Sequence, residues 1–84
     1  NEKLVFSECF DFGCVEWQMD VKNGIIQDNH LYTDVMDTEW SHKIENCVLG
    51  IEASEVELAN ALRHLNDPQV NELIKALQDQ GISL

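Results

Sequence analysis

The segment FDFGCVEWQMDVKNGIIQDNHLYTD, residues 10–34, decides the fold of this chain. Apolar and polar side chains alternate around Trp17, which is the two-residue period of a strand with one buried face. Asn23-Gly24 follows, and this dipeptide accepts the positive φ angles of a two-residue type I′ turn. The segment therefore predicts a β-hairpin whose second strand runs toward Tyr32.

A further strand is predicted before this hairpin. Residues 4–10, LVFSECF, are rich in residues that favour strands, and Gly13 permits a bend before the next strand begins. The first half of the chain is therefore predicted to be a three-stranded antiparallel meander.

The apolar period changes to that of a helix after Asp34. The apolar stripe of this first predicted helix consists of Trp40, Ile44, Cys47, Val48 and Ile51. Asp37 or Thr38 is placed to cap its start, and Gly50 ends or loosens its last turn.

Two more helices follow, each with a recognisable start. Ser54 and Glu57 form the Ser-x-x-Glu pattern of a capping box, and Asp67-Pro68 combines an N-cap with proline at the first helical position. Gly81 is placed to stop the last helix. The order βββααα predicts one α+β domain over residues 1–84, with helices covering one face of the sheet.

Composition limits the possible partners and the size of the core. The chain has 84 residues and a net charge of −11, from 16 acidic and 5 basic side chains. Such a charge repels nucleic acid and anionic membranes, so neither is an expected partner. A domain this small buries only about 60 to 65% of its unfolded surface, which makes a deep substrate cleft hard to build.

The cysteines suggest a reducing compartment. Cys9, Cys14 and Cys47 are odd in number and lack the spacing of a zinc site, so we expect reduced thiols in a cytoplasmic protein, with Cys14 and Cys47 packed as small apolar groups. No apolar run is long enough to span a bilayer. The chain begins at Asn1 without an initiator methionine, which suggests a processed protein or a piece of a longer one.

The residues give no sign of a catalytic centre. His42 and His64 fall outside the apolar stripes and are expected to be solvated, and His30 has no partner that sequence alone can identify. The acidic residues at turns and helix starts are better explained by capping than by acid–base chemistry. Phosphate-binding, hydrolase and metalloprotease motifs are absent. The residues alone therefore predict a non-catalytic α+β module.

Four segments together resemble the small C-terminal domain of bacterial lipoate-protein ligases. These segments are residues 10–16 (FDFGCVE), 19–26 (MDVKNGII), 31–34 (LYTD) and 44–50 (IENCVLG). The resemblance continues weakly over residues 52–84 and so covers almost the whole chain. It departs from the family pattern at Phe12, where tryptophan is usual, and the expected Trp-x-x-Gly lead-in is missing before Asn1.

The resemblance implies an accessory role. In this family the large domain binds lipoate, ATP and magnesium and forms lipoyl-adenylate, and the lipoyl group then passes to a lysine of an acceptor domain. The small domain packs on the large one for activation and moves aside for transfer. No catalytic, cofactor-binding or metal-binding residue is therefore carried over to this chain, and the large domain, in cis or as a separate chain, is the expected partner.

A docking surface is expected near the hairpin and its approaches, at Phe12, Gly13, Asp34 and Trp40. Each of these residues also has an ordinary structural explanation: a bend for Gly13, a turn or cap for Asp34, and core packing for the two aromatic residues. An interdomain contact of about 600 to 1,500 Å² leaves relative motion as the default, which suits a domain that docks and releases.

Two alternatives remain beside the accessory domain. The first is an iron–sulfur or sulfur-transfer scaffold, because the small domain is similar in fold to such scaffolds and three cysteines are present. The positions of Cys9, Cys14 and Cys47 do not resemble an exposed cluster site, however. The second alternative is a protein-binding adaptor unrelated to lipoate.

Overall fold

The computed structural model describes residues 1–82 and contains three strands followed by three helices. The elements are β1 (Glu2–Phe10), β2 (Gly13–Lys22), β3 (Ile25–Thr33), α1 (Thr38–Val48), α2 (Glu55–Arg63) and α3 (Pro68–Gln80). The strands form one antiparallel sheet in the order β1-β2-β3. The predicted α+β meander with the order βββααα is therefore confirmed.

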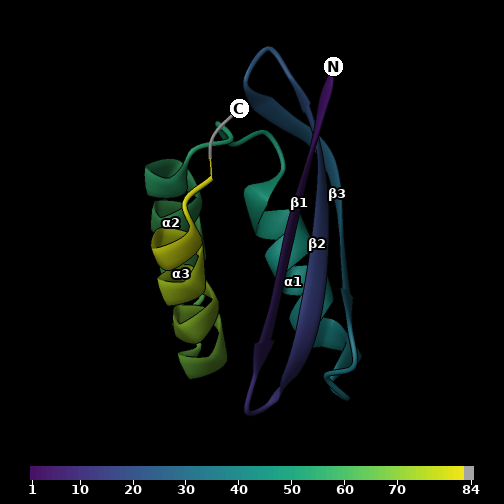
Figure 1. Cartoon of the computed structure of the whole chain (residues 1–84), viewed down its shortest axis with the longest axis vertical. Coiled ribbons are helices and arrows are strands. Elements are labelled where there is room, and N and C mark those ends of the chain that lie inside the picture. Colours follow the sequence, from purple (N-terminus) through teal and green to yellow (C-terminus); the bar gives the residue numbers. More distant parts are fainter. Residues whose placement is uncertain (83–84) are drawn as a thin grey trace.

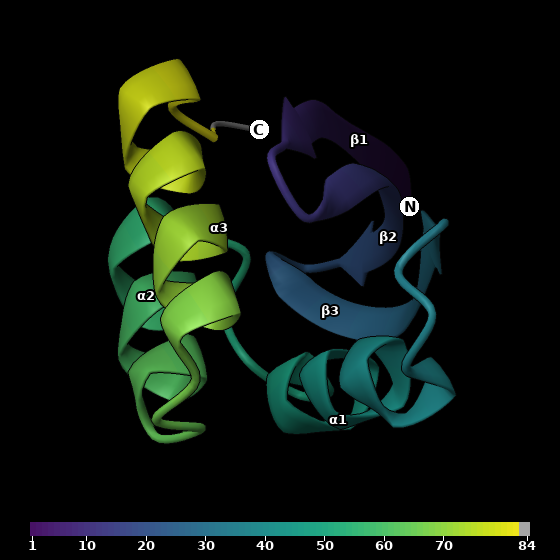
Figure 2. The same cartoon turned by 90° about the horizontal axis from the view of Figure 1, so that it is seen from below.

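The three helices lie on one side of a curved sheet (Figures 1 and 2). Helix α1 packs along β3, and the paired helices α2 and α3 complete the layer, with α3 reaching β1. The end of α3 is joined to β1 by Gln80, whose side-chain amide donates to the Ser7 carbonyl at 3.2 Å and to the Glu8 carboxylate at 2.8 Å.

Strand β2 forms the centre of the core, as its alternating pattern predicts. The buried positions on this strand are Val15, Trp17, Met19 and Val21. Glu16 and Asp20, which alternate with them, are exposed on the outer face of the sheet. The helices thus pack against one face of the central strand, and its other face is exposed to solvent.

A bulge in β3 sets which of its residues enter the core. Asp20 pairs with Asp28 but Val21 pairs with Ile26, so Gln27 has no partner on β2. The extra residue reverses the alternation of side chains along the strand. Ile26 and Leu31 are consequently both buried although they are five residues apart.

The Asn23-Gly24 turn has the predicted geometry and an unpredicted support. Both residues have positive φ, at 54° and 79°, as a type I′ turn requires. The connection between α1 and α2 lies against it. The Ala53 N–H donates to the Gly24 carbonyl at 2.7 Å, and the Ile26 N–H donates to the Ile51 carbonyl at 2.9 Å. The turn is therefore held from outside the hairpin as well as from within.

The predicted helix starts are confirmed, and one helix end differs. The caps are Asp37, Ser54 and Asp67, which accept hydrogen bonds from the backbone N–H groups of Glu39, Glu57 and Gln69, respectively. Helix α1 ends at Val48, so Ile51, which the apolar stripe placed on this helix, lies beyond it. The chain leaves the helix at Leu49, whose ψ of 131° is extended, and Gly50, with a φ of 79°, then turns it toward β3, where the Gly50 N–H donates to the Ile26 carbonyl.

The Asp67 cap should make part of the stability dependent on pH. Its carboxylate accepts from Lys43 Nζ at 2.6 Å and from the Gln69 N–H at 2.8 Å. Partial burial acts to raise the pKa of Asp67, but the hydrogen bonds from Lys43 and from the α3 backbone outweigh it and bring the pKa below the ordinary value of 3.8. The stabilisation is therefore fully present above that ordinary value and is lost as the pH falls through the lower, folded-state pKa.

We expect Asp67→Ala to lower the free energy of unfolding by about 1 kcal/mol at neutral pH, because an N-cap and an ion pair are lost. In urea denaturation, the difference from the parent chain should narrow as the pH is lowered from about 5 to about 3. Asp79→Ala, at an exposed position near the end of the same helix, is the matched control and should show no such narrowing. An Asp67→Ala difference that stayed constant over this range would contradict the prediction.

Candidate docking site

The structure brings together the four residues predicted to form a docking surface. They lie where the β1–β2 turn meets the connection from β3 to α1, at the lower end of the molecule in Figure 1. The ring of Phe12 meets the ring of Trp40 edge-on, with centroids 5.6 Å apart. Asp34 accepts a hydrogen bond from the Cys14 N–H at 2.8 Å, next to Gly13. We refer to Phe12, Gly13, Asp34 and Trp40 as the Phe12 cluster.

The position of the Phe12 cluster differs from the expectation in one respect. The sequence placed it near the hairpin, but the Asn23-Gly24 turn lies at the opposite end of the sheet (Figure 1). Gly13 begins β2 and Lys22 ends it, and a strand of ten residues is about 30 Å long. The Asn23-Gly24 turn is therefore a structural support, remote from the candidate docking site.

The four residues contribute differently to the surface. Asp34 is exposed, Phe12 and Gly13 are half-buried, and Trp40 is only 2% exposed. Trp40 is thus a core residue that supports Phe12 from behind. A partner could touch Phe12 and Asp34 directly, but it could reach Trp40 only through Phe12.

A close approach explains the glycine at position 13. Its φ is +147°, and a Cβ there would lie 2.7 Å from Asp34 Oδ1 and 3.1 Å from Val35 Cγ2. Any side chain would displace the carboxylate that holds the Cys14 amide. Gly13 is therefore required by the contact between β2 and the Asp34 loop as well as by the bend that the sequence predicted.

The surface around the Phe12 cluster combines aromatic and acidic groups. Phe10 and Phe12 stack with centroids 4.9 Å apart. With Asp11 and Glu72 they line a hollow of about 240 Å³ between the β1–β2 turn and α3. Sequence reasoning missed Glu72 because its approach to Phe12 depends on how α3 packs against the β1–β2 turn, and it missed Phe10 because the stacking on Phe12 depends on the shape of that turn.

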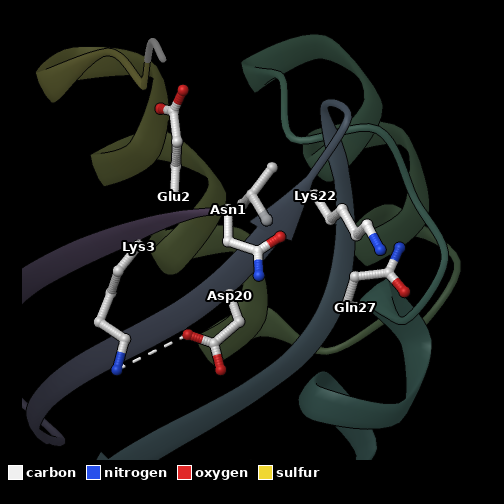
Figure 3. Close-up of a pocket in the computed structure, with 7 residues that line it drawn as sticks. Asn1, Glu2, Lys3, Asp20, Lys22 and Gln27 are labelled. Carbon is white, nitrogen blue, oxygen red and sulfur yellow. Dashed lines mark ion pairs between the residues drawn. The ribbon is translucent and has the colours of Figure 1, made fainter.

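A larger hollow lies elsewhere, where β1 begins and β2 ends. It measures about 560 Å³ and is lined by Asn1, Glu2, Lys3, Asp20, Val21, Lys22 and Gln27 (Figure 3). Its ion pair, between Lys3 Nζ and Asp20 at 3.6 Å, joins side chains that are 60% and 55% exposed. Pairs as exposed as this contribute little. The lining offers no histidine or cysteine to act as a base or nucleophile.

The expectation of reduced thiols is wrong for two of the three cysteines, because Cys9 and Cys14 form a disulfide. They face each other directly across β1 and β2, and both side chains project from the outer face of the sheet. Cys14 is therefore exposed and does not pack in the core. The alternation around Trp17 was enough to predict which face of β2 carries Cys14. The pairing of Cys14 with Cys9, in contrast, depends on the register that the turn sets between β1 and β2.

Cys47 behaves as predicted. It is half-buried on α1, packs against the core, and is free. Burial raises the pKa of its thiol, which keeps the thiol protonated near neutral pH.

With Cys9 and Cys14 joined to each other, the iron–sulfur alternative loses two of its three candidate ligands. Within residues 1–82, no three histidine, cysteine or acidic side chains are grouped so that they could hold a metal ion.

Glu45 is a structural residue that the sequence did not reveal. One carboxylate oxygen accepts from the Leu31 N–H at 2.7 Å, on the outer edge of β3, and the other lies 3.2 Å from His42 Nδ1. His30 lies 3.9 Å from the same carboxylate, and all three histidines of the chain are exposed, as expected for His42 and His64. The group therefore covers part of the outer edge of β3. No helix in the described part of the chain has the length and apolar character needed to cross a membrane.

The comparison with protein families agrees with this geometry. The chain matches the family described as bacterial lipoate protein ligase C-terminus over residues 3–80. The match begins in β1 and reaches the last residue of α3, so it includes every element of the fold. No individual curated protein matches the chain.

Proposed function

Because the chain belongs to the family of bacterial lipoate-protein ligase C-terminal domains, we propose that it is the non-catalytic accessory domain of such a ligase. In this proposal it docks on the catalytic large domain and supports the ATP-dependent activation of lipoate to lipoyl-adenylate. Lipoate, ATP and magnesium bind the large domain, and lipoyl acceptor domains are contacted transiently. The proposed location is the cytoplasm, where ATP is available. The family match over residues 3–80 is the observation that carries the proposal.

We place the docking contact at the Phe12 cluster. Phe12 presents an aromatic edge that Trp40 supports from behind, and the hydrogen bond between Asp34 and the Cys14 amide fixes the adjoining loop. Rigid aromatic groups on a fixed backbone contribute much of the binding energy at protein interfaces. The carboxylates of Asp11 and Asp34 beside this aromatic edge favour a partner surface with basic side chains.

The test is lipoyl-adenylate formation by a ligase large domain that lacks its small domain. The assay contains lipoate, ATP and magnesium and is run with and without this 84-residue chain added in trans. Restored adenylation would support the proposal. A large domain from the same source that binds the chain and stays inactive, or that does not bind it, would count against an accessory role.

A substitution tests where docking occurs. We expect Phe12→Ala to weaken binding to the large domain by about 2 kcal/mol, or about thirtyfold, because a central aromatic contact is lost. Val56→Ala is the matched control, since Val56 is 65% exposed in the first turn of α2, next to the connection that lies against the Asn23-Gly24 turn and away from the Phe12 cluster. Calorimetric titration measures both affinities, and thermal melting shows whether each variant is folded. If both folded variants lost the same amount of affinity, the large domain would not dock at the Phe12 cluster.

A further inference from the structure

The Cys9–Cys14 disulfide lies at the end of the β1–β2 hairpin, on the face of the sheet turned away from the helices. Both cysteines are exposed, whereas the adjacent residues Phe10 and Val15 are half-buried and buried. Exposed disulfides are open to attack by thiols, and they include the labile and regulatory ones. The sulfur atoms of this pair are therefore accessible in the folded chain.

The bond is not needed to bring the two strands together. It encloses only residues 10–13, and the stabilisation from a disulfide grows with the length of the loop that it closes. The same strands are paired from Glu2–Val21 to Phe10–Gly13. The β1–β2 ladder therefore keeps the hairpin in register when the disulfide opens, so the folded domain can exist in both redox states.

The disulfide is connected directly to the candidate docking site. Phe12 lies inside the loop that it closes. The backbone of Cys14 is bound on both sides, because its N–H donates to Asp34 at 2.8 Å and its carbonyl accepts from the Thr33 hydroxyl at 2.7 Å. Opening the bond thus removes the covalent restraint on the β1 side of the turn, where only the strand pairing remains, while the β3 side is still held by the hydrogen bonds of Cys14.

We infer that Cys9 and Cys14 form a reversible thiol–disulfide exchange site whose reducing partner is a small dithiol. One thiolate of the dithiol attacks a sulfur atom of the pair, forms a mixed disulfide and displaces the other cysteine, which takes up a proton. The second thiol of the dithiol attacks the mixed disulfide, closes a ring and displaces the remaining cysteine. Two electrons and two protons pass from the dithiol to the cysteine pair, and the dithiol becomes a cyclic disulfide.

Reduction also changes the docking surface, a consequence that rests on the proposed function. With the bond intact, the Phe12 turn is held rigid next to Trp40. With the bond open, the turn gains conformational freedom within the paired hairpin, and a partner has to restrict that freedom on binding, which costs conformational entropy. The oxidised chain is therefore the form that docks well, and the reduced chain docks about tenfold more weakly.

The exchange is tested on the 84-residue chain without any partner. The folded chain is equilibrated with mixtures of reduced and oxidised dithiothreitol, quenched with acid and alkylated, and the alkylated cysteines are located by peptide mass spectrometry. We expect Cys9 and Cys14 to gain and lose their labels together and reversibly, and circular dichroism to stay that of a folded chain. Half-buried Cys47 is the internal control, and its labelling should not follow the dithiothreitol ratio. A disulfide that is reduced only after denaturant is added would overturn the inference.

The docking consequence is tested separately with the large domain. Oxidised chain, reduced chain and a Cys9→Ser/Cys14→Ser double variant are titrated against it. The reduced chain and the double variant should bind about tenfold more weakly than the oxidised chain, and dithiothreitol should not affect the double variant. Equal binding by all three would overturn redox control of docking and leave the accessory role standing. Binding by none would refute the accessory role and redox control together, while the labelling result decides the exchange site by itself.

Discussion

Replacing Trp17 by alanine is expected to lower the free energy of unfolding by about 4 kcal/mol. Trp17 is fully buried at the centre of β2, and its Nε1 donates to Asn29 Oδ1 at 2.9 Å. Asn29 in turn donates to the Glu45 carbonyl at 3.0 Å, so the indole connects β2 with β3 and α1. A domain has only about 5 to 15 kcal/mol of stability in total, so this change should leave the chain close to unfolding. Urea denaturation followed by circular dichroism measures the effect.

A comparison of the two buried tryptophans separates the contribution of ring volume to stability from the contribution of the indole hydrogen bond. Trp40 Nε1 is buried and has no hydrogen-bond partner in the described structure, in contrast to Trp17 Nε1. Trp17→Phe leaves the Asn29 oxygen without its donor, whereas Trp40→Phe removes a polar group that was already unpaired. We expect Trp17→Phe to cost about 1 to 2 kcal/mol more than Trp40→Phe. Equal costs would mean that the indole hydrogen bond contributes nothing to stability.

Gly13→Ala is the second change with a large expected effect, about 3 kcal/mol of lost stability. The new Cβ would lie 2.7 Å from Asp34 Oδ1, so the carboxylate must leave the Cys14 amide. The alanine would also be strained in its backbone, because a φ of +147° is rarely adopted by residues with side chains. Both effects act at the Phe12 cluster, so binding to the large domain should weaken along with stability.

Gly24→Ala is the matched control for this change. Gly24 also has a positive φ, at +79°, but a Cβ there would meet nothing within 4 Å. The control therefore carries only the backbone strain, about 1 kcal/mol, and lies at the end of the sheet remote from the Phe12 cluster. Chemical denaturation of the two variants gives the difference. If Gly24→Ala were as destabilising as Gly13→Ala, the contact with Asp34 would not be the cause.

The features that were predictable from the sequence are those encoded by neighbouring residues. The Asn23-Gly24 turn follows from the φ angles that this dipeptide accepts. The caps at Ser54 and Asp67 follow from side chains that reach an amide two or three residues ahead. In each case, the residues that determine the local structure are at most three positions apart in the sequence.

The features that could not be predicted depend on register and packing between distant segments. The Cys9–Cys14 disulfide requires the alignment of β1 with β2, and a shift by one residue would turn the two sulfur atoms to opposite faces. The contact of Glu45 with the Leu31 amide joins residues 14 positions apart and depends on where α1 settles. The Phe12 cluster was predicted as a set of residues, but its place in the molecule followed from the direction of β2.

Because of the bulge at Gln27, the number of residues in β3 determines which of its side chains are buried, whatever side chain stands at position 27. Gln27 is exposed and pairs with no residue of β2, so by contact alone it would look dispensable. Yet it is the residue that lets Ile26 and Leu31 face the same way. Another polar residue at this position would leave both side chains buried, whereas deletion of the residue would turn either Ile26 or Leu31 out into solvent. The number of residues here therefore matters more to the fold than the identity of the residue at position 27.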